Sequence, residues 1–329
     1  MVIPLGKLIR HLMGFVYKSL FMLESGIKPI WVFDGISPEM KKQELKRRRK
    51  IKEEAKAKAN EAKDIGDNKE VLKQMSRNIK VDSKMKYDSI KLLELMGVPV
   101  MEAKSEAEAQ CVHLLKKGKV SAVVSDDMDC LTFGSKNLLK GVKNNKEKIV
   151  EICLEDVLEG LELNMDEFID FCILSGCDYV STYKGLGPTT ALKLIQEHRT
   201  LEKVVEVIKI ENEKYREEKG KDRYIPPEVW DQEGSFDYVT ARELFKKPDV
   251  HDIDVEIKIK PPQEEELKTF LEDKGFAADR INSIIKRLKE SGKKKPQISI
   301  EAFFGKPKKI VDTKGKKKGQ LKSQKKARR

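Results

Sequence analysis

Acidic side chains recur where the sequence predicts that short buried strands end. In a parallel sheet the carboxyl ends of neighbouring strands meet at one edge, so carboxylates placed there lie close enough to repel one another. Two magnesium ions about 4 Å apart would remove that repulsion, activate a water molecule and stabilise the attacking and leaving oxygens of a phosphodiester. The acids at these strand ends are Asp34, Glu106, Glu108, Asp127 and Asp129.

Each of these acids also has an ordinary structural explanation. Asp127 and Asp129 stand two residues apart in a segment that we expect to be extended, which would turn both side chains to one side and let them share a cation. The run from Ser105 to Glu108 is equally a capping box, in which Ser105 caps a helix and Glu108 reaches back. Asp34 alone fits an ordinary turn before a glycine. Taken as a set, the acids favour metal binding over these alternatives.

A glycine-rich turn stands further along the chain. Gly185-Leu-Gly187 precedes a proline and an apolar helical pattern, an arrangement typical of a helix-hairpin-helix. Such a turn presents backbone N–H groups and a helix N-terminus to a phosphate, which grips one DNA strand without reading its sequence. The alternative is a packed helical turn with no ligand. Asp178, just upstream, is a further candidate for the metal cluster.

A basic helix is predicted between the first two strands. Residues 39–64 contain eleven basic and six acidic groups with almost no large apolar side chain, so we expect the helix to be solvated. Lys41 and Arg48 are seven residues apart in it, hence on one face and two turns apart. Both could polarise a scissile phosphate. The alternative is that their charges are solvated, as most charges in such a run are.

The composition narrows the possible chemistry. The five cysteines form no C-x-x-C pair and the four histidines form no H-E-x-x-H motif, which gives no support to a disulfide framework or a zinc site. Any metal should therefore be a hard cation bound by oxygen, in a reducing intracellular compartment. No apolar run reaches the roughly 18 to 20 residues of a membrane span, so we expect a soluble protein with no membrane partner.

The net charge of +12 is concentrated at the end of the chain. Residues 306–329 hold twelve Lys and Arg against one acid, and the preceding 305 residues carry 55 basic and 54 acidic groups. From residue 291 onward Lys, Gly, Pro and Gln dominate, and we expect disorder. Within this tail the segment 297–304 carries large apolar side chains, which favours docking in a partner's pocket over a stray edge strand.

The elements that position these residues alternate between strands and helices. Strands are predicted at residues 29–33, 98–100 and 120–124. With helices between them, they predict an α/β fold whose mainly parallel sheet is flanked by helices. After residue 151 the chain turns mostly helical. Helices are predicted at residues 8–25, 39–64, 67–97, 105–118, 168–175, 188–198, 240–246, 263–274 and 277–291.

On these residues the sequence resembles eukaryotic flap endonucleases, structure-specific nucleases of replication and repair. The resemblance covers essentially the whole chain. It implies a PIN-like nuclease core in residues 1–150 with a helical arch at about 37–85, a helix-hairpin-helix and C-terminal helices in 151–292, and a disordered basic tail in 293–329. The motifs that carry it are Trp31-Val-Phe-Asp-Gly35, Ser105-Glu-Ala-Glu-Ala109, Asp127-Met-Asp-Cys-Leu-Thr-Phe-Gly134, Gly176-Cys-Asp-Tyr179 and Gly185-Leu-Gly-Pro188.

The resemblance also implies roles for single residues. Lys41 and Arg48 match the basic pair of the arch through which a 5′ flap threads, and Lys18 stands where the family has an arginine that contacts DNA. The implied ligands of one magnesium ion are Asp34, Glu106 and Glu108, and those of the other are Asp127, Asp129 and Asp178. Further implied DNA contacts are Glu106, Gly176, Asp178, Gly185 and Gly187. A potassium ion would be bound in the hairpin by Thr182, Tyr183 and Leu186.

The implied activity is hydrolysis of one phosphodiester near the junction of a branched DNA with a 5′ flap, together with 5′ to 3′ exonuclease activity. The implied roles are Okazaki-fragment maturation and long-patch base-excision repair, carried out by a monomer in the nucleus (nucleolus and nucleoplasm) and in the mitochondrion. The segment 297–304 matches the motif that docks on the sliding clamp, proliferating cell nuclear antigen. Its docking residues are Gln297, Ile300, Phe303 and Phe304.

Family members begin with a further segment that has no counterpart in this sequence. That segment carries a first strand and an additional metal-ligand aspartate, so we expect a truncated gene model or an alternative start. The missing ligand motivates a different hypothesis, a catalytically inactive DNA-binding protein tethered to the clamp. A further alternative is a sister nuclease of the excision-repair or exonuclease branch. The compact spacing between Asp34 and Glu106 argues against the excision-repair branch, which carries a very long insertion there.

Overall fold

The computed structural model describes residues 10–65, 70–71, 82–142, 148–230, 236–252 and 257–292. Its strands are β1 (Trp31–Phe33), β2 (Val100–Glu102), β3 (Val123–Val124), β4 (Asn137–Lys140) and β5 (Val150–Cys153). A short 3-10 helix, η1 (Glu39–Lys41), precedes the longest helix, α3. The α-helices are α2 (Arg10–Glu24), α3 (Lys42–Asp64), α5 (Ser83–Leu95), α6 (Ala107–Lys116), α7 (Asp129–Thr132), α8 (Leu154–Leu161), α9 (Met165–Ser175), α10 (Pro188–His198), α11 (Leu201–Lys219), α12 (Pro227–Trp230), α13 (Tyr238–Lys246), α14 (Glu264–Asp273) and α15 (Ala278–Gly292).

The described strands form two small sheets. β1 and β2 pair in parallel, with Trp31 opposite Val100. β3 and β4 are also parallel, with Val123 opposite Leu138, whereas β5 runs antiparallel to β4. The α/β class and the parallel pairing are therefore confirmed. β4 and β5 have no predicted counterpart.

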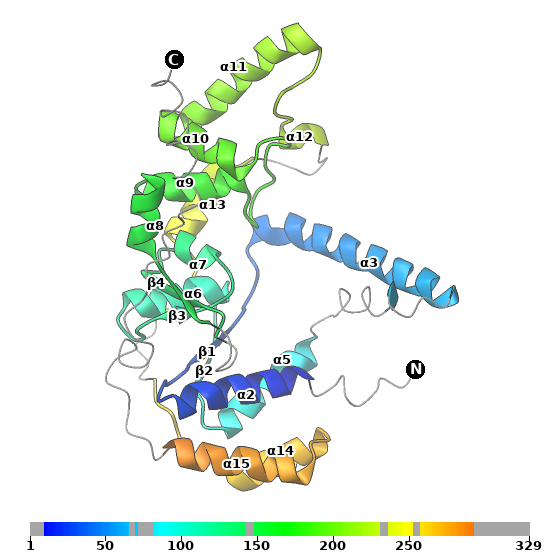
Figure 1. Ribbon diagram of the computed structural model, residues 1–329, viewed down its shortest axis with the longest axis vertical. Helices are drawn as coiled ribbons and strands as arrows, with labels where there is room; N and C mark the ends of the chain where they lie inside the picture. The colour runs from blue at the N-terminus through cyan, green and yellow to red at the C-terminus, as the bar shows by residue number, and fades with distance from the viewer. Residues whose placement is uncertain are drawn as a thin grey trace, which may run out of the picture.

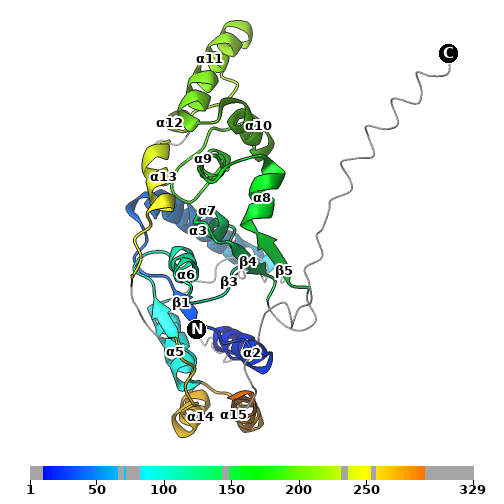
Figure 2. The same cartoon turned by 90° about the vertical axis from the view of Figure 1, so that its left-hand side faces the viewer.

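The described helices gather around two hydrophobic cores. The larger core includes Val123, Ile173 and Phe245 and lies among the elements from α6 to α13. The second core joins α2 and α5 to α14 and α15. Figure 1 shows β1 and β2 between the two groups of helices. In Figure 2, as in Figure 1, α11 lies at one end of the molecule and α14 and α15 at the other. The acids that follow β1 and β2 therefore stand where the two groups meet.

Helix α3 projects from the body of the molecule (Figure 1). Its charged side chains are mostly exposed, as predicted for residues 39–64. Three alanines at helical spacing in α3 are buried, and they are Ala55, Ala59 and Ala62. The first three residues of the predicted helix form η1 instead, so Lys41 lies just before α3 begins.

Helix bounds agree with prediction where local signals are strong. α10 spans Pro188–His198 as predicted, with Pro188 in its first turn. α9 begins earlier than predicted because Asn164 and Glu167 form a capping box in front of it. α8 and α11 have no predicted counterpart. In α11 the charged residues outnumber the apolar ones, which obscures the apolar stripe of Leu201, Val204 and Ile208 that it buries.

Several predictions lie partly or wholly outside the described residues. These include part of the arch at 37–85, part of the helix at 67–97, the tail at 293–329 and its clamp motif at 297–304. The proposed domain boundaries stay predictions. Of the helices that the structure describes, none combines the length and the apolar character needed to cross a bilayer.

Candidate active site

Asp34 follows β1 directly and lies at the N-terminus of α6. Its Oδ1 accepts a 3.1 Å hydrogen bond from the backbone N–H of Ala107, and the N–H of Gly35 donates to the carbonyl of Ser105 at 2.7 Å. The N-cap residue of α6 is Glu106, with no side-chain capping bond, so the capping box of Ser105 is wrong. The Asp34 carboxylate instead satisfies one of the N–H groups that a helix start leaves without partners.

Gly35 permits this close approach of β1 to the start of α6. A Cβ at this position would lie 2.0 Å from the carbonyl oxygen of Ala103 and 2.6 Å from that of Lys104. We expect Gly35→Ala to lower the free energy of unfolding by about 3 kcal/mol, measured by urea denaturation, because backbone must move to make room. Gly160→Ala is the control, since a Cβ there meets nothing within 4 Å. Equal stability of the two variants would contradict the expectation.

Glu106 and Glu108 enter the site from the first turn of α6. Glu106 is 7 % exposed. Burial raises the pKa of Glu108, and the negative charges of Asp34, Asp127 and Glu106 raise it further. These charges act at short range, so Glu108 lies among the other predicted ligands.

Asp127 and Asp129 lie between β3 and α7. Asp129 is the first residue of α7, and its backbone N–H donates to Asp127 Oδ1 at 3.0 Å. The expected extended segment is therefore wrong, because a helical turn begins here. Burial raises the pKa of Asp129 to about 7, and the charges of Asp127, Asp178 and Glu106 contribute to the rise. The two acids are thus gathered by tertiary packing rather than by strand alternation.

Because the pKa of Asp129 is raised, we expect the free energy of unfolding of the metal-free protein to fall as pH rises. In the unfolded chain this carboxyl ionises near its ordinary pKa of 3.8, and in the folded protein near 7. Between these values the folded state holds a proton that the unfolded state has lost. Folding therefore loses stability as pH rises from about 4 to about 7, by on the order of 4 kcal/mol.

Asp129→Asn imitates the protonated carboxyl and removes this cost. With a chelator present, urea denaturation should find the variant more stable than the parent at pH 8 and equal to it near pH 4. Asp126→Asn, a change at the neighbouring exposed acid, is the control and should show no such difference. A stability difference between Asp129→Asn and the parent that does not change with pH would contradict the expectation.

Two cations from η1 and α3 reach the acids. The Lys41 ammonium contacts Oε1 of Glu106 and lies 3.1 Å from Oδ2 of Asp178. Arg48 donates from Nη2 to Oδ1 of Asp178 at 2.7 Å and from Nε to Glu44 at 2.7 Å. Burial lowers the pKa of Lys41, but the hydrogen bonds and charges of Glu106 and Asp178 outweigh burial and the net pKa is raised. Lys41 lies in η1 and Arg48 in α3, and both side chains meet Asp178.

The structure brings all six predicted ligands into one cluster. Their oxygens form an all-carboxylate donor set, which suits a hard divalent cation. In the part of the chain that the structure describes, no three His, Cys, Asp or Glu side chains stand as they would around a metal ion. Several carboxylate oxygens instead accept from protein N–H groups or contact the Lys41 ammonium. The residue types therefore suit magnesium, although their side chains are arranged around protein donors rather than around an ion. The acids with such partners are Asp34, Glu106, Asp127 and Asp178.

Similarities to known proteins agree with this geometry. Residues 5–55 match the XPG N-terminal domain and residues 97–178 match the XPG I-region. The chain is 44% identical over 302 residues to flap endonuclease 1 of Tetrahymena thermophila, an alignment that covers 91% of this chain and 76% of the relative. It is also 44% identical over 304 residues to flap endonuclease 1-A of Sorghum bicolor, covering 91% and 75%. The chain belongs to the flap endonuclease family.

Solved structures share the flap endonuclease fold. Flap endonuclease-1 from Methanococcus jannaschii is 33% identical, with a TM-score of 0.60 over 85% of this chain and 81% of that one. The catalytic core of Rad2 in complex with DNA substrate is 23% identical, with a TM-score of 0.63 over 84% of each chain, and supports the fold alone. As a member of the flap endonuclease family, this chain is a metal-dependent, structure-specific nuclease.

The turn between α9 and α10 has the form expected for the helix-hairpin-helix of a flap endonuclease. Gly176 ends α9 with a φ of 122°, and Gly187 is the N-cap of α10. Gly185 adopts a φ of 95°, and a Cβ there would come within 3.2 Å of the carbonyl oxygen of Arg223. Both positive φ values favour glycine. Gly187 and Pro188 at the N-terminus of α10 are exposed, so a phosphate group can approach this end of the helix.

The remaining assignments implied by the flap endonuclease resemblance stay predictions. Thr182, Tyr183 and Leu186 lie in the same turn, where the N–H of Leu186 donates to the carbonyl of Tyr183 at 3.2 Å. Lys18 lies on α2, with its ammonium 5.6 Å from the centroid of the Trp31 ring. The clamp residues lie outside the described part of the chain, and they are Gln297, Ile300, Phe303 and Phe304.

Three side chains at the site have no role assigned from the sequence. Glu44 accepts a hydrogen bond from Arg48, and their i,i+4 spacing is a signal that could have indicated the contact. Lys86 donates to the carbonyl of Asp34 at 2.7 Å. The hydroxyl of Tyr179 donates to the carboxylate of Glu106, 73 residues earlier in the chain. No local pattern signals these last two contacts, because they join distant segments.

Proposed function

We propose that this chain cuts one phosphodiester at the base of a 5′ single-stranded DNA flap, with two magnesium ions held by the acidic cluster. One observation carries the proposal: Lys41 and Arg48 of the arch face the same carboxylates that are the predicted metal ligands. A phosphodiester in that space would find cations for its non-bridging oxygens beside the ligands of the ions.

The metal assignment follows the family pattern and the donor chemistry of the cluster. When bound, the magnesium ions would activate a water molecule and neutralise the leaving oxygen. The carboxylates supply oxygen ligands for a hard cation, and a bound divalent ion would relieve the repulsion among them that contributes to the raised pKa of Asp129. We assign one ion to Asp34, Glu106 and Glu108, and the other to Asp127, Asp129 and Asp178.

The DNA is gripped away from the cut by backbone phosphate contacts. The turn of Gly185 and Gly187 offers the N-terminus of α10 to one strand. A potassium ion bound by Thr182, Tyr183 and Leu186 would add positive charge at the same turn, and Lys18 would contact DNA from α2. These contacts are independent of sequence, which suits an enzyme that recognises a junction.

The products are a 5′-phosphate and a 3′-hydroxyl, and the same site carries out 5′ to 3′ exonuclease cleavage. We place the protein, as a monomer, in Okazaki-fragment maturation and long-patch base-excision repair, in the nucleus and the mitochondrion. The segment 297–304 would tether it to the sliding clamp, proliferating cell nuclear antigen. The basic tail adds further phosphate contact.

A labelled 5′-flap duplex incubated with the full chain and Mg²⁺ tests the activity. We expect one main cut near the junction, its loss with a chelator, and no such cut in a fully paired duplex of the same sequence. Tight binding of the flap without any cut would contradict the proposal and support an inactive, clamp-tethered DNA-binding protein. Cleavage that is unchanged by the chelator would contradict the metal mechanism.

A further inference from the structure

Tyr179 follows Asp178 directly and points its hydroxyl at Glu106. The side chain is only 4 % exposed, and its ring lies 4.9 Å, centroid to centroid, from the ring of Phe245 on α13. Both rings belong to the larger hydrophobic core. Because packed core side chains keep one rotamer, the position of the Tyr179 hydroxyl is fixed by the core.

The two oxygens of the Glu106 carboxylate have different partners. Oε2 accepts a hydrogen bond from the Tyr179 hydroxyl, and Oε1 faces the Lys41 ammonium. The ammonium also reaches Asp178, so Oε1 is the oxygen on the side of the other acids. A carboxylate held by one oxygen against the core cannot rotate freely, and its second oxygen keeps one direction.

We propose that Tyr179 is a positioning residue that aims Oε1 of Glu106 at the metal-binding space. The inference rests on the proposed function, since Glu106 is taken there as a magnesium ligand. Oε1 meets Lys41, and the same oxygen would be available to a metal ion on that side without rotation of the carboxylate. The hydroxyl also ties the loop after α9 to the start of α6, so two segments that supply ligands keep one relative position.

A purely structural role for Tyr179 makes a different prediction. The aromatic ring packs in the core whether or not it carries a hydroxyl, so Tyr179→Phe keeps the packing and removes only the hydrogen bond. A group that orients a metal ligand changes metal affinity by about 10- to 100-fold when it is removed. A side chain that only fills the core leaves metal affinity unchanged.

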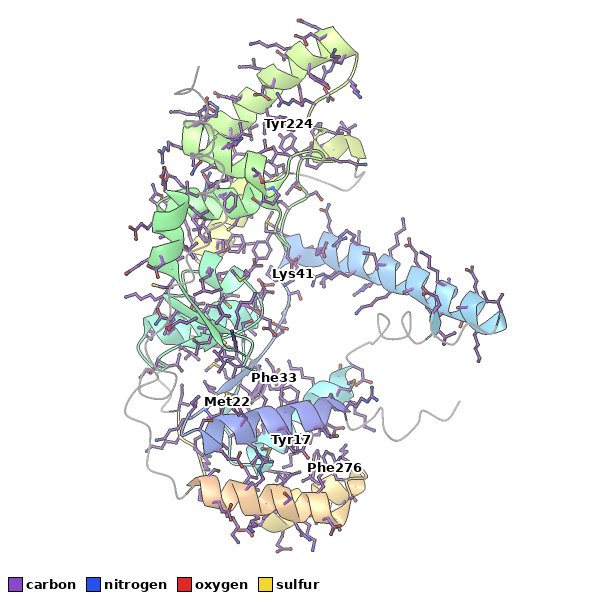
Figure 3. The ribbon with its side chains drawn as sticks, in the orientation of Figure 1. Tyr17, Met22, Phe33, Lys41, Tyr224 and Phe276 are labelled. Atoms are coloured by element: carbon purple, nitrogen blue, oxygen red, sulfur yellow. The ribbon has the colours of Figure 1, made fainter. Side chains whose placement is uncertain are left out.

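The test uses the full chain with Tyr179→Phe and, as the matched control, Tyr224→Phe. Tyr224 is a buried tyrosine beside α11, and Figure 3 places it away from Lys41. Mn²⁺ affinity is measured by calorimetry without DNA, and the Mg²⁺ dependence of flap cleavage is measured in parallel. For Tyr179→Phe we expect about tenfold weaker Mn²⁺ binding and a Mg²⁺ requirement raised by the same factor, with the rate recovered at high Mg²⁺. The Tyr224 variant should match the parent.

A second background shows whether Tyr179 acts through Glu106. In a Glu106→Gln chain, adding Tyr179→Phe should weaken Mn²⁺ binding no further. The reason is that this chain no longer has the carboxylate that Tyr179 orients. An equal loss in both backgrounds would overturn the inference, as would a Tyr179→Phe chain that binds Mn²⁺ like the parent. If the parent itself neither binds Mn²⁺ nor cuts the flap, the proposed function fails and the inference fails with it. Normal activity of the parent with an unaffected Tyr179→Phe chain overturns the inference alone.

Discussion

Asp129→Ala is expected to reduce cleavage of a 5′-flap substrate by about a thousandfold or more while flap binding is largely retained. The expectation follows from the position of Asp129, which is half-buried at the start of α7 and lies close to the charges of Asp127, Asp178 and Glu106. Removing it leaves one of the two proposed ions short of a ligand. The proposed phosphate contacts in the turn before α10 are untouched by the change. Single-turnover cleavage and a binding titration of the same labelled flap measure the two effects.

The control for Asp129 is its neighbour Asp126. Asp126 is exposed, and its Oδ1 lies 3.4 Å from the backbone N–H of Gly141. Asp126→Ala removes an equal charge close to the site without touching the proposed ligands, so it should cut at nearly the parental rate. Comparable losses in the two variants would mean that general charge, rather than ligation by Asp129, governs the rate. Full activity of Asp129→Ala would refute the metal assignment.

Lys41→Ala is the second change with a large expected effect, a loss of about a hundredfold in the cleavage rate at saturating Mg²⁺. Lys41 is the cation that contacts both Glu106 and Asp178. A bound metal that neutralised those carboxylates would leave the Lys41 ammonium free to contact the phosphodiester. Divalent metal binding should be kept or tightened in the variant, because the ammonium no longer competes for the same oxygens.

Lys42→Ala serves as the control for this prediction. Lys42 is the next residue along, exposed, and paired with Glu39 on the same turn. Its loss removes the same charge from the arch and should change the rate little, since exposed pairs contribute little energy. Rates measured across a series of Mg²⁺ concentrations separate a lost phosphate contact from a lost metal site. A defect in Lys41→Ala that high Mg²⁺ fully restores would contradict a role toward the phosphate.

The acids of the site could be predicted from the sequence because strand ends are local features. Asp34 follows a short apolar run, and Glu106 and Glu108 stand at the start of a predicted helix. The shared direction of parallel strands then brings these positions to one edge. The turn of Gly185 and Gly187 could also be predicted from the sequence, since glycine and proline are typical of turns.

The orientation of those acids could not be predicted in the same way. Asp129 begins a four-residue helix, which is too short for a periodic pattern, so an extended segment was the natural expectation. Ser105 has every local feature of an N-cap, yet Asp34, from a distant segment, provides the bond to the helix start. The contacts of Tyr179 and Lys41 with Glu106 join residues 73 and 65 positions apart. Tertiary packing decides such details, and it overrides local preference.

The central claim is that the cluster binds two divalent ions between its two groups of acids. Anomalous diffraction from crystals of the full chain grown with Mn²⁺ tests it most directly. We expect two anomalous peaks about 4 Å apart, one beside Asp34 and Glu108 and the other beside Asp129 and Asp178. Saturating Mn²⁺ with no anomalous peak among these carboxylates would contradict the claim.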